Sequence, residues 1–204
     1  MILNVKSIRN NAKKSLYTNI NGEEEKWSYA FIFVKLVIPL ISCLIVYINQ
    51  DKLMEDPKVI VMLLSLFSGL MFGVLIKIPD KFKDLEPKVN ETLTQESKRK
   101  QIKNYLKLFM YSLSYSILVA LFSIFFVILN SFFPSLIELK LSELKIVENI
   151  NQIHFWTTLK GIIVILYRVL LVNYLLNFLF FIFKAVTNLY EFMLYEFSKI
   201  EEKK

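Results

Sequence analysis

The sequence predicts an all-α integral membrane protein, a bundle of four transmembrane helices with amphipathic helices on its cytoplasmic side. Of the 204 residues, 55% are hydrophobic, which is more than a soluble domain usually contains. The chain has 18 Phe and 10 Tyr but only four Gly and five Pro, a composition that suits long helices better than turn-rich sheets. Four apolar segments are each long enough to cross a hydrocarbon core of about 30 Å at about 1.5 Å per residue.

The four predicted spans are apolar around nearly their whole circumference, whereas the helices of a water-soluble bundle would each need a polar stripe. They cover residues 29–48, 59–76, 108–129 and 159–183. The first span follows a polar stretch and is too long for a signal peptide, so we expect it to stay in the mature protein. We expect one transmembrane domain, 29–183, flanked by a basic amphipathic segment, 1–28, and a C-terminal helix, 184–204.

Lys and Arg are distributed unevenly along the chain. Five lie in 1–28, nine in the link 77–107 and four in 184–204, against four in the two remaining links and Lys160 at the outer edge of the fourth span. Because cytoplasmic segments carry the excess of positive charge, both termini and the link 77–107 should lie in the cytoplasm of a bacterial cell, with the chain in the inner membrane. The net charge of +7 mostly expresses this bias and needs no nucleic-acid-binding role.

The segment before the first span has the spacing of an amphipathic helix. Its apolar positions are Val5, Ile8, Ala12 and Leu16. Its basic residues are Lys6, Arg9, Lys13 and Lys14. Such a helix is expected on the inner leaflet, where these residues contact either anionic lipid or an anionic ligand that docks there.

Two cations, Lys35 and Arg168, lie inside the spans, which contain no Asp or Glu. Lys35 is roughly 9 Å from the inner end of its span, close enough for its stem to carry the ammonium group back to the headgroups. Arg168 is near the middle of the fourth span, where insertion costs about 2.5–3.5 kcal/mol. Arg168 should therefore face water, a cluster of carbonyl groups or another subunit.

The fourth span is polar on two faces. Asn173, Asn177 and Lys184 share one face, and Gly161 and Arg168 lie roughly opposite. Either a homo-oligomer, for which we assume a tetramer, or one bundle with internal water would accommodate both faces. Lys35, Arg168, Asn173 and Asn177 are therefore the candidate pore-lining or polar intramembrane residues.

Two spans carry small residues at four-residue steps. Ser65, Gly69 and Gly73 form such a stripe in the second span, and Ser112 and Ser116 begin one in the third. Small residues let helix backbones approach closely, which predicts helix packing at both stripes. The alternative is that the serines line a pore.

The tail after the fourth span has a seam of apolar residues at helical spacing. The seam consists of Val186, Leu189, Met193, Phe197 and Ile200, and we expect it to bind another copy of the chain or a soluble protein. The outer link, 130–158, fits both a strand and an amphipathic helix, and the sequence leaves this open.

The sequence contains no recognisable catalytic chemistry. It has one His, His154, and one Cys, Cys43, so it lacks clustered metal ligands and any intrachain disulfide. No acidic residue lies in a span, and the four Gly do not form a phosphate-binding loop. We expect no enzymatic activity, no cofactor and no metal.

Three runs of sequence carry a family resemblance from Val59 onward: GLMFGVLIKIPDKFKD, YLKLFMYSLSYSILVALFSIFF and YLLNFLFFIFKAVTNLYEFMLYEF. In their order of hydropathy and their aromatic positions they resemble the small four-span membrane effector proteins of bacterial anti-phage defence systems of the Hailong and Kiwa type. The resemblance implies a homo-oligomer that works with a soluble cytosolic partner and depolarises or permeabilises the cell on infection.

The leading functional hypothesis is an oligomeric ion-conducting pore, or a membrane-depolarising effector, that a cytosolic partner or an anionic nucleotide or oligonucleotide signal opens. Lys35 and Arg168 would bias a lumen toward anions. A membrane interaction protein, such as an immunity factor against a pore-forming toxin, is the main alternative. A small transporter is disfavoured because the sequence lacks inverted repeats and pairs of broken helices.

Overall fold

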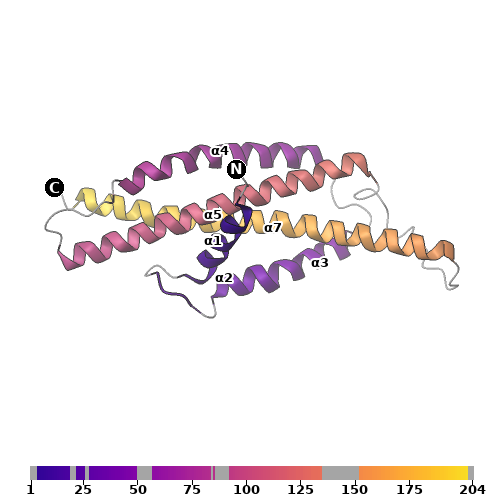
Figure 1. The fold of residues 1–204 in the computed structure, drawn as a ribbon, viewed down its shortest axis with the longest axis horizontal. Helices are drawn as coiled ribbons and strands as arrows, with labels where there is room; N and C mark the ends of the chain where they lie inside the picture. Colours follow the sequence, from indigo (N-terminus) through magenta and orange to yellow (C-terminus); the bar gives the residue numbers. More distant parts are fainter. Residues whose placement is uncertain are drawn as a thin grey trace.

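The computed structural model describes residues 4–18, 22–25, 28–49, 57–83, 85, 92–134 and 152–201. Regular structure in this part of the chain is helical (Figure 1). The elements are α1 (Val5–Tyr17), α2 (Tyr29–Ile32), the π-helical turn η1 (Phe33–Val37), α3 (Ile38–Ile48), α4 (Pro57–Lys83), α5 (Leu93–Phe132) and α7 (Gln152–Glu201).

Four helical segments are long and apolar enough to cross a membrane, and they coincide with the four predicted spans. They are Tyr29–Ile48, Pro57–Lys83, Leu93–Phe132 and Thr158–Leu194. The prediction of an all-α, multi-pass membrane protein is therefore confirmed. The outer link lies largely outside the described residues.

The first span is a continuous rod made of α2, η1 and α3, although it contains Pro39. The N–H of Ile38 donates to the carbonyl of Phe33, five residues earlier. A widened turn of this kind accommodates a proline, which has no N–H to donate and crowds the preceding turn. Pro39 therefore accompanies a π-helical turn rather than a break in the helix.

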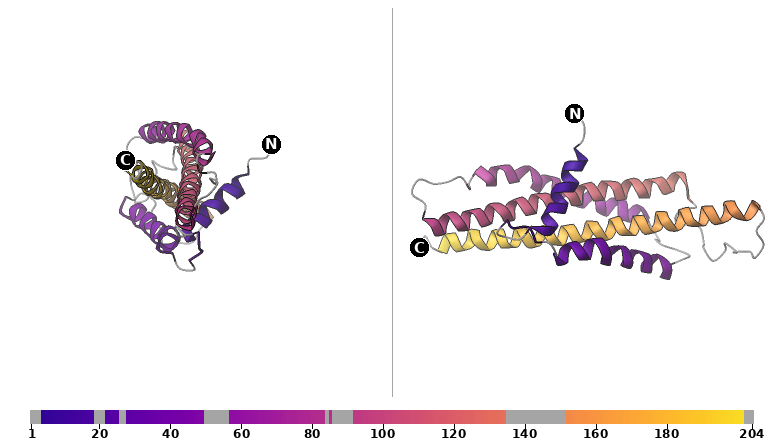
Figure 2. Two further views of the ribbon diagram at one scale, coloured as in Figure 1. Left: turned by 90° about the vertical axis from the view of Figure 1, so that its left-hand side faces the viewer. Right: turned by 60° about the horizontal axis from the view of Figure 1, so that its bottom comes forward.

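The helices α5 and α7 are much longer than the spans predicted within them, at 40 and 50 residues. A capping box begins α5: the Thr92 hydroxyl accepts from the N–H of Gln95 at 3.4 Å, and the Gln95 side chain accepts from the N–H of Thr92 at 3.1 Å. The predicted fourth span and the predicted tail helix form one rod, α7. Figures 1 and 2 show α5 and α7 side by side over most of their length.

The main core lies where α4, α5 and α7 meet. Its buried residues include Leu64, Met71 and Ile78 of α4, Leu106, Phe109 and Leu113 of α5, and Phe178, Ala185 and Phe192 of α7. The first span packs against α7, and α1 packs across the bundle near the middle of its length (Figure 2).

The small-residue stripe of α4 does not pack against a helix within the described chain, so its predicted packing partner stays a prediction. Ser65, Gly69 and Gly73 are exposed, and a Cβ atom added at either glycine would meet no atom within 4 Å. The face of α4 that contacts α5 instead contains Leu64 and Met71. Larger apolar side chains fill the space between the two helices, so the stripe faces outward.

The predicted seam of the tail also faces largely outward. Val186 and Met193 are exposed and Leu189 is half-buried, whereas the neighbouring Ala185 and Phe192 are buried in the main core. The side chains of the last two seam residues, at positions 197 and 200, lie outside the described part. The expected external partner of this seam stays a prediction.

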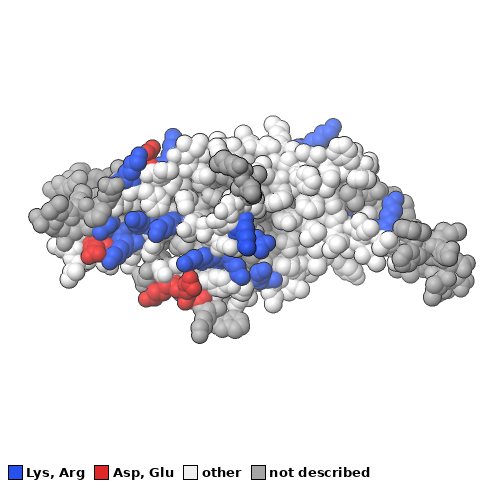
Figure 3. All heavy atoms as spheres, in the orientation of Figure 1, with Lys and Arg blue, Asp and Glu red and all other residues white. Residues whose placement is uncertain are grey.

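Charge is concentrated on one part of the molecule. Figure 3 shows Lys and Arg side chains gathered over α1 and over the end of the bundle where α4 ends and α5 begins. The surface on the other side of α1 is almost free of charge until the far end of the rods. We call the charged part, which carries Lys81 and Lys83 of α4 and Lys98 and Lys100 of α5, the basic end.

Candidate functional site

The helix α1 packs on the bundle through its apolar face. The Asn4 side chain caps its start by accepting from the N–H of Ser7 at 3.2 Å. Ala12 and Leu16 are buried in a cluster with Phe181 of α7. Burying a leucine side chain contributes roughly 1.5–3 kcal/mol. The face that was expected on the inner leaflet is thus covered, in its C-terminal half, by the protein itself.

A lysine of α7 fixes the end of α1. The Lys184 ammonium group, which is partly buried, donates a hydrogen bond to the backbone carbonyl of Ser15. Ser15 is in the last turn of α1, where carbonyl groups have no partner within the helix, and a cation is favourable there. Lys184 therefore contacts α1 and does not line a surface together with the two asparagines of α7.

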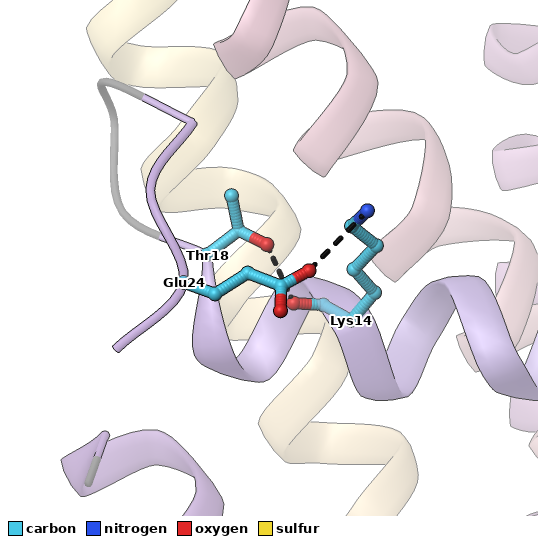
Figure 4. A network of polar contacts seen from close by, with 3 residues as sticks. All are labelled: Lys14, Thr18 and Glu24. Atoms are coloured by element: carbon cyan, nitrogen blue, oxygen red, sulfur yellow. Dashed lines mark hydrogen bonds and ion pairs between the residues drawn. The ribbon is translucent and has the colours of Figure 1, made fainter. Parts of the chain in front are cut away.

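The chain turns back on itself after α1, and one of the predicted basic residues forms an ion pair with the returning segment. Gly22 has a φ of 85°, a conformation that glycine adopts without strain. The turn brings Glu24 back beside Thr18, and the Glu24 carboxylate pairs with the Lys14 ammonium group at 3.4 Å (Figure 4). Lys14 therefore already has an anionic partner. Lys6 is exposed near the start of α1.

A pocket of about 440 Å³ lies between α1, the first span, α5 and α7. Its lining residues are Arg9, Ala12, Lys13 and Leu16 of α1, Val34, Lys35 and Pro39 of the first span, Tyr115 of α5, and Asn173, Asn177 and Phe181 of α7. None of these residues is an Asp or a Glu. We call this cavity the basic pocket.

The basic pocket collects five of the residues that the sequence singled out, from two separate predictions. Lys35, Asn173 and Asn177 were expected inside the membrane, and Arg9 and Lys13 were expected at its surface. The structure brings all five to one cavity. Because α1 lies across the middle of the long helices, its basic face is level with the polar residues of the spans.

The two asparagines of α7 form a pair within the pocket. The Asn177 amide group donates to the backbone carbonyl of Asn173 at 2.9 Å and to its side-chain oxygen at 2.5 Å. This bond orients the Asn173 side chain, and its own NH₂ group forms no hydrogen bond with a described residue. Asn173 can therefore donate to a ligand.

Arg168 is not part of the basic pocket. Its side chain is completely buried in the bundle, and it interacts with a group of the protein. Of the three expected surroundings, the burial shows that Arg168 is not exposed to water within this chain, and a cluster of carbonyl groups stays a prediction. Both polar faces of the fourth span are accommodated inside one chain, so these faces no longer require an oligomer.

The serine stripe of α5 packs against a neighbouring helix. Ser112 and Ser116 are completely buried. The Ser116 hydroxyl donates to the carbonyl of Leu113 at 2.8 Å and lies 3.5 Å from the sulfur of Met71 on α4. Helix packing, rather than the lining of a lumen, is therefore the arrangement of Ser116 in this structure.

Pro39 and Phe181 were not among the residues predicted for a site. Phe181 lies four residues after Asn177, which in turn lies four residues after Asn173, so helical spacing alone could have placed it on their face. Pro39 has the same relation to Lys35. The sequence contained no signal that these two faces meet.

The described residues contain no group of three or more His, Cys, Asp or Glu side chains that could hold a metal ion. The basic pocket is a candidate site in this part of the chain, and its groups are suited to binding an anion. No family model matches the chain, and neither a curated protein nor a solved structure matches it.

Proposed function

We propose that this chain is a signal-gated membrane effector, which forms an ion-conducting pore or otherwise depolarises the bacterial inner membrane as a homo-oligomer. Its termini and the basic end lie in the cytoplasm in this proposal, as the distribution of Lys and Arg favours. A soluble cytosolic partner or an anionic ligand supplies the signal. The basic pocket, at the junction of α1 with three membrane helices, is the observation that carries the proposal.

The position of α1 supports a gating role. It contacts α5 directly, and it is held to α7 by the burial of Leu16 and by the hydrogen bond from Lys184 to Ser15. An event that moves α1 would therefore change the packing of helices that cross the membrane. A ligand can shift such an equilibrium only if it binds the two arrangements differently, and a pocket formed partly by α1 meets that condition.

The outward face of α4 supports assembly into an oligomer. Ser65, Gly69 and Gly73 leave an exposed stripe on which another helix backbone could approach closely. In this proposal the stripe contacts a second copy of the chain.

Ion flux from liposomes tests the gating step. The full chain in sealed vesicles should conduct little at rest, and Leu16→Asp, which places a charge in the contact between α1 and the bundle, should raise the flux. Helix content and oligomer size should match the original chain. If neither protein conducts while both remain intact oligomers, the pore hypothesis is refuted.

A membrane interaction protein, such as an immunity factor, is the second candidate, because the same exposed stripe of α4 could bind a helix of another protein. The two candidates differ in the effect of Gly69→Leu combined with Gly73→Leu. Loss of an oligomer and of flux favours the effector. Two results together favour the immunity factor. The original chain is monomeric in detergent, and it protects cells from a pore-forming toxin only while both glycines are present.

A further inference from the structure

Three cations of the basic pocket share one cavity that no described Asp or Glu lines. Arg9 and Lys13 lie one turn apart on α1, and Lys35 comes from the first span. None of the three forms an ion pair with a residue that the structure describes, whereas Lys14 of the same helix is paired with Glu24. Like charges around a common cavity repel each other, so a bound anion would lower the energy of this arrangement.

The donors of the pocket match a phosphate group better than a carboxylate. A phosphate monoester carries a charge of about −1.5 to −2 and three strong acceptor oxygens. The Arg9 guanidinium can donate two parallel hydrogen bonds, and Lys13 and Lys35 supply two further charges. The NH₂ group of Asn173 and the Tyr115 hydroxyl add neutral donors.

The other half of the pocket is apolar, which sets the character of the rest of the ligand. Val34, Pro39 and Phe181 line the pocket together with Ala12 and Leu16. A volume of about 440 Å³ is in the range of small-molecule sites and exceeds what an inorganic phosphate ion fills. The ligand therefore has an apolar group attached to its phosphate.

We propose that the basic pocket binds a phosphate monoester that carries an apolar group, with the phosphate on Arg9, Lys13 and Lys35 and the apolar group against Pro39 and Phe181. The proposal deepens the proposed function, on which it rests for the consequence of binding, by naming the ligand class of the receiving site. Such a monoester could be the headgroup of a lipid in the adjacent leaflet or a soluble metabolite.

Binding is measured on the full chain in a neutral detergent, by calorimetric titration with phenyl phosphate. Arg9→Gln, Lys13→Gln and Lys35→Gln should each weaken binding about tenfold, because each removes one charge-assisted contact. Lys6→Gln removes a charge from the same helix outside the pocket and should change the affinity less than twofold. Arg9→Lys, which keeps the charge, should retain more affinity than Arg9→Gln. Circular dichroism confirms that each variant is folded.

A second arm distinguishes the two sources of the phosphate. The chain is moved into nanodiscs that contain phosphatidic acid or phosphatidylcholine, and the lipids it retains are identified by native mass spectrometry. Phenyl phosphate binding in detergent indicates a soluble ligand. Selective retention of phosphatidic acid that Lys13→Gln abolishes, without phenyl phosphate binding, indicates the lipid.

The proposal is overturned if neither ligand binds, or if Lys6→Gln weakens binding as much as Lys13→Gln. These outcomes are independent of the flux measurement. Binding without any triggered flux would refute the pore and leave the ligand assignment intact. Flux without binding would refute the ligand assignment and leave the pore intact.

Discussion

At the scale of single residues, Arg168 shows how a side chain that is costly in a membrane can be accommodated. An arginine in the middle of a span costs about 2.5–3.5 kcal/mol on insertion, and its five N–H groups cannot donate to lipid. In this protein the side chain is completely buried between helices and interacts with the protein. Arg168 is therefore a structural residue of the bundle interior in this arrangement.

Replacing Arg168 with Leu should destabilise the folded bundle, because it removes the interaction that the completely buried arginine makes with the protein. The loss of such an interaction at a buried position costs about 1–3 kcal/mol. Thermal unfolding in detergent should show a lower midpoint for Arg168→Leu. Lys160→Leu, an exposed position on the same helix, should unfold near the temperature of the original chain. A midpoint for Arg168→Leu at or above the original value would show that the arginine is not needed for packing.

At the scale of elements, α1 is the helix whose environment differs most from the expectation. Its amphipathic pattern is that of a helix on a lipid surface. The protein instead covers Ala12 and Leu16 and binds the C-terminal end of the helix through Lys184. Only a few apolar side chains hold α1, so it should separate from the bundle more easily than α5 and α7 separate from each other.

Leu16→Ala should release α1 while the long helices stay folded. Truncating a buried leucine to alanine costs about 2–5 kcal/mol, and each 1.4 kcal/mol corresponds to a factor of ten in an equilibrium. Hydrogen exchange read by mass spectrometry should therefore show at least tenfold faster exchange across Val5–Tyr17, with unchanged protection in the middle of α5 and α7. The exposed substitution Lys6→Ala serves as the control. Equal acceleration in all three helices would mean that α1 is part of the main cooperative unit.

At the scale of the whole molecule, the rods are longer than a bilayer is thick. The 50 residues of α7 correspond to about 75 Å at about 1.5 Å per residue, whereas the hydrocarbon core is about 30 Å thick. The helices α5 and α7 remain packed together toward the basic end, where Ile102 and Phe192 are buried. The main core therefore continues beyond the apolar spans and joins the membrane helices to the charged end.

The proposed orientation places Lys6 and Lys98 on one side of the membrane and Lys52 and Lys145 on the other. Single cysteines at these positions, in a Cys43→Ser background, should react with a membrane-impermeant maleimide in two classes. In intact spheroplasts the first pair should be protected and the second pair labelled, and lysis should make all four reactive. Labelling of Lys6→Cys without lysis would contradict the proposed orientation.

The sequence by itself determined that the long helices suit the hydrocarbon of a membrane, and that four of them are long enough to cross it. Long apolar runs in hydrocarbon must form their backbone hydrogen bonds internally, so each run is expected to be a helix. The order of hydropathy along the chain therefore predicts the spans 29–48, 59–76, 108–129 and 159–183. Four helices of the required length and hydropathy lie there. The continuation of the fourth span into the tail as one rod was missed, because a change from apolar to amphipathic residues does not by itself interrupt a helix.

Only the tertiary structure decided which faces meet. The sequence showed that Lys35, Asn173 and Arg168 are costly in a span, but periodicity gives positions around one helix and says nothing about its neighbours. Packing turns Arg168 inward, leaves Gly69 and Gly73 outside, and brings Lys35 and Asn173 together with α1. The physical reason is that side-chain volumes across the bundle select one arrangement of helices, and residues far apart in the chain determine that fit together.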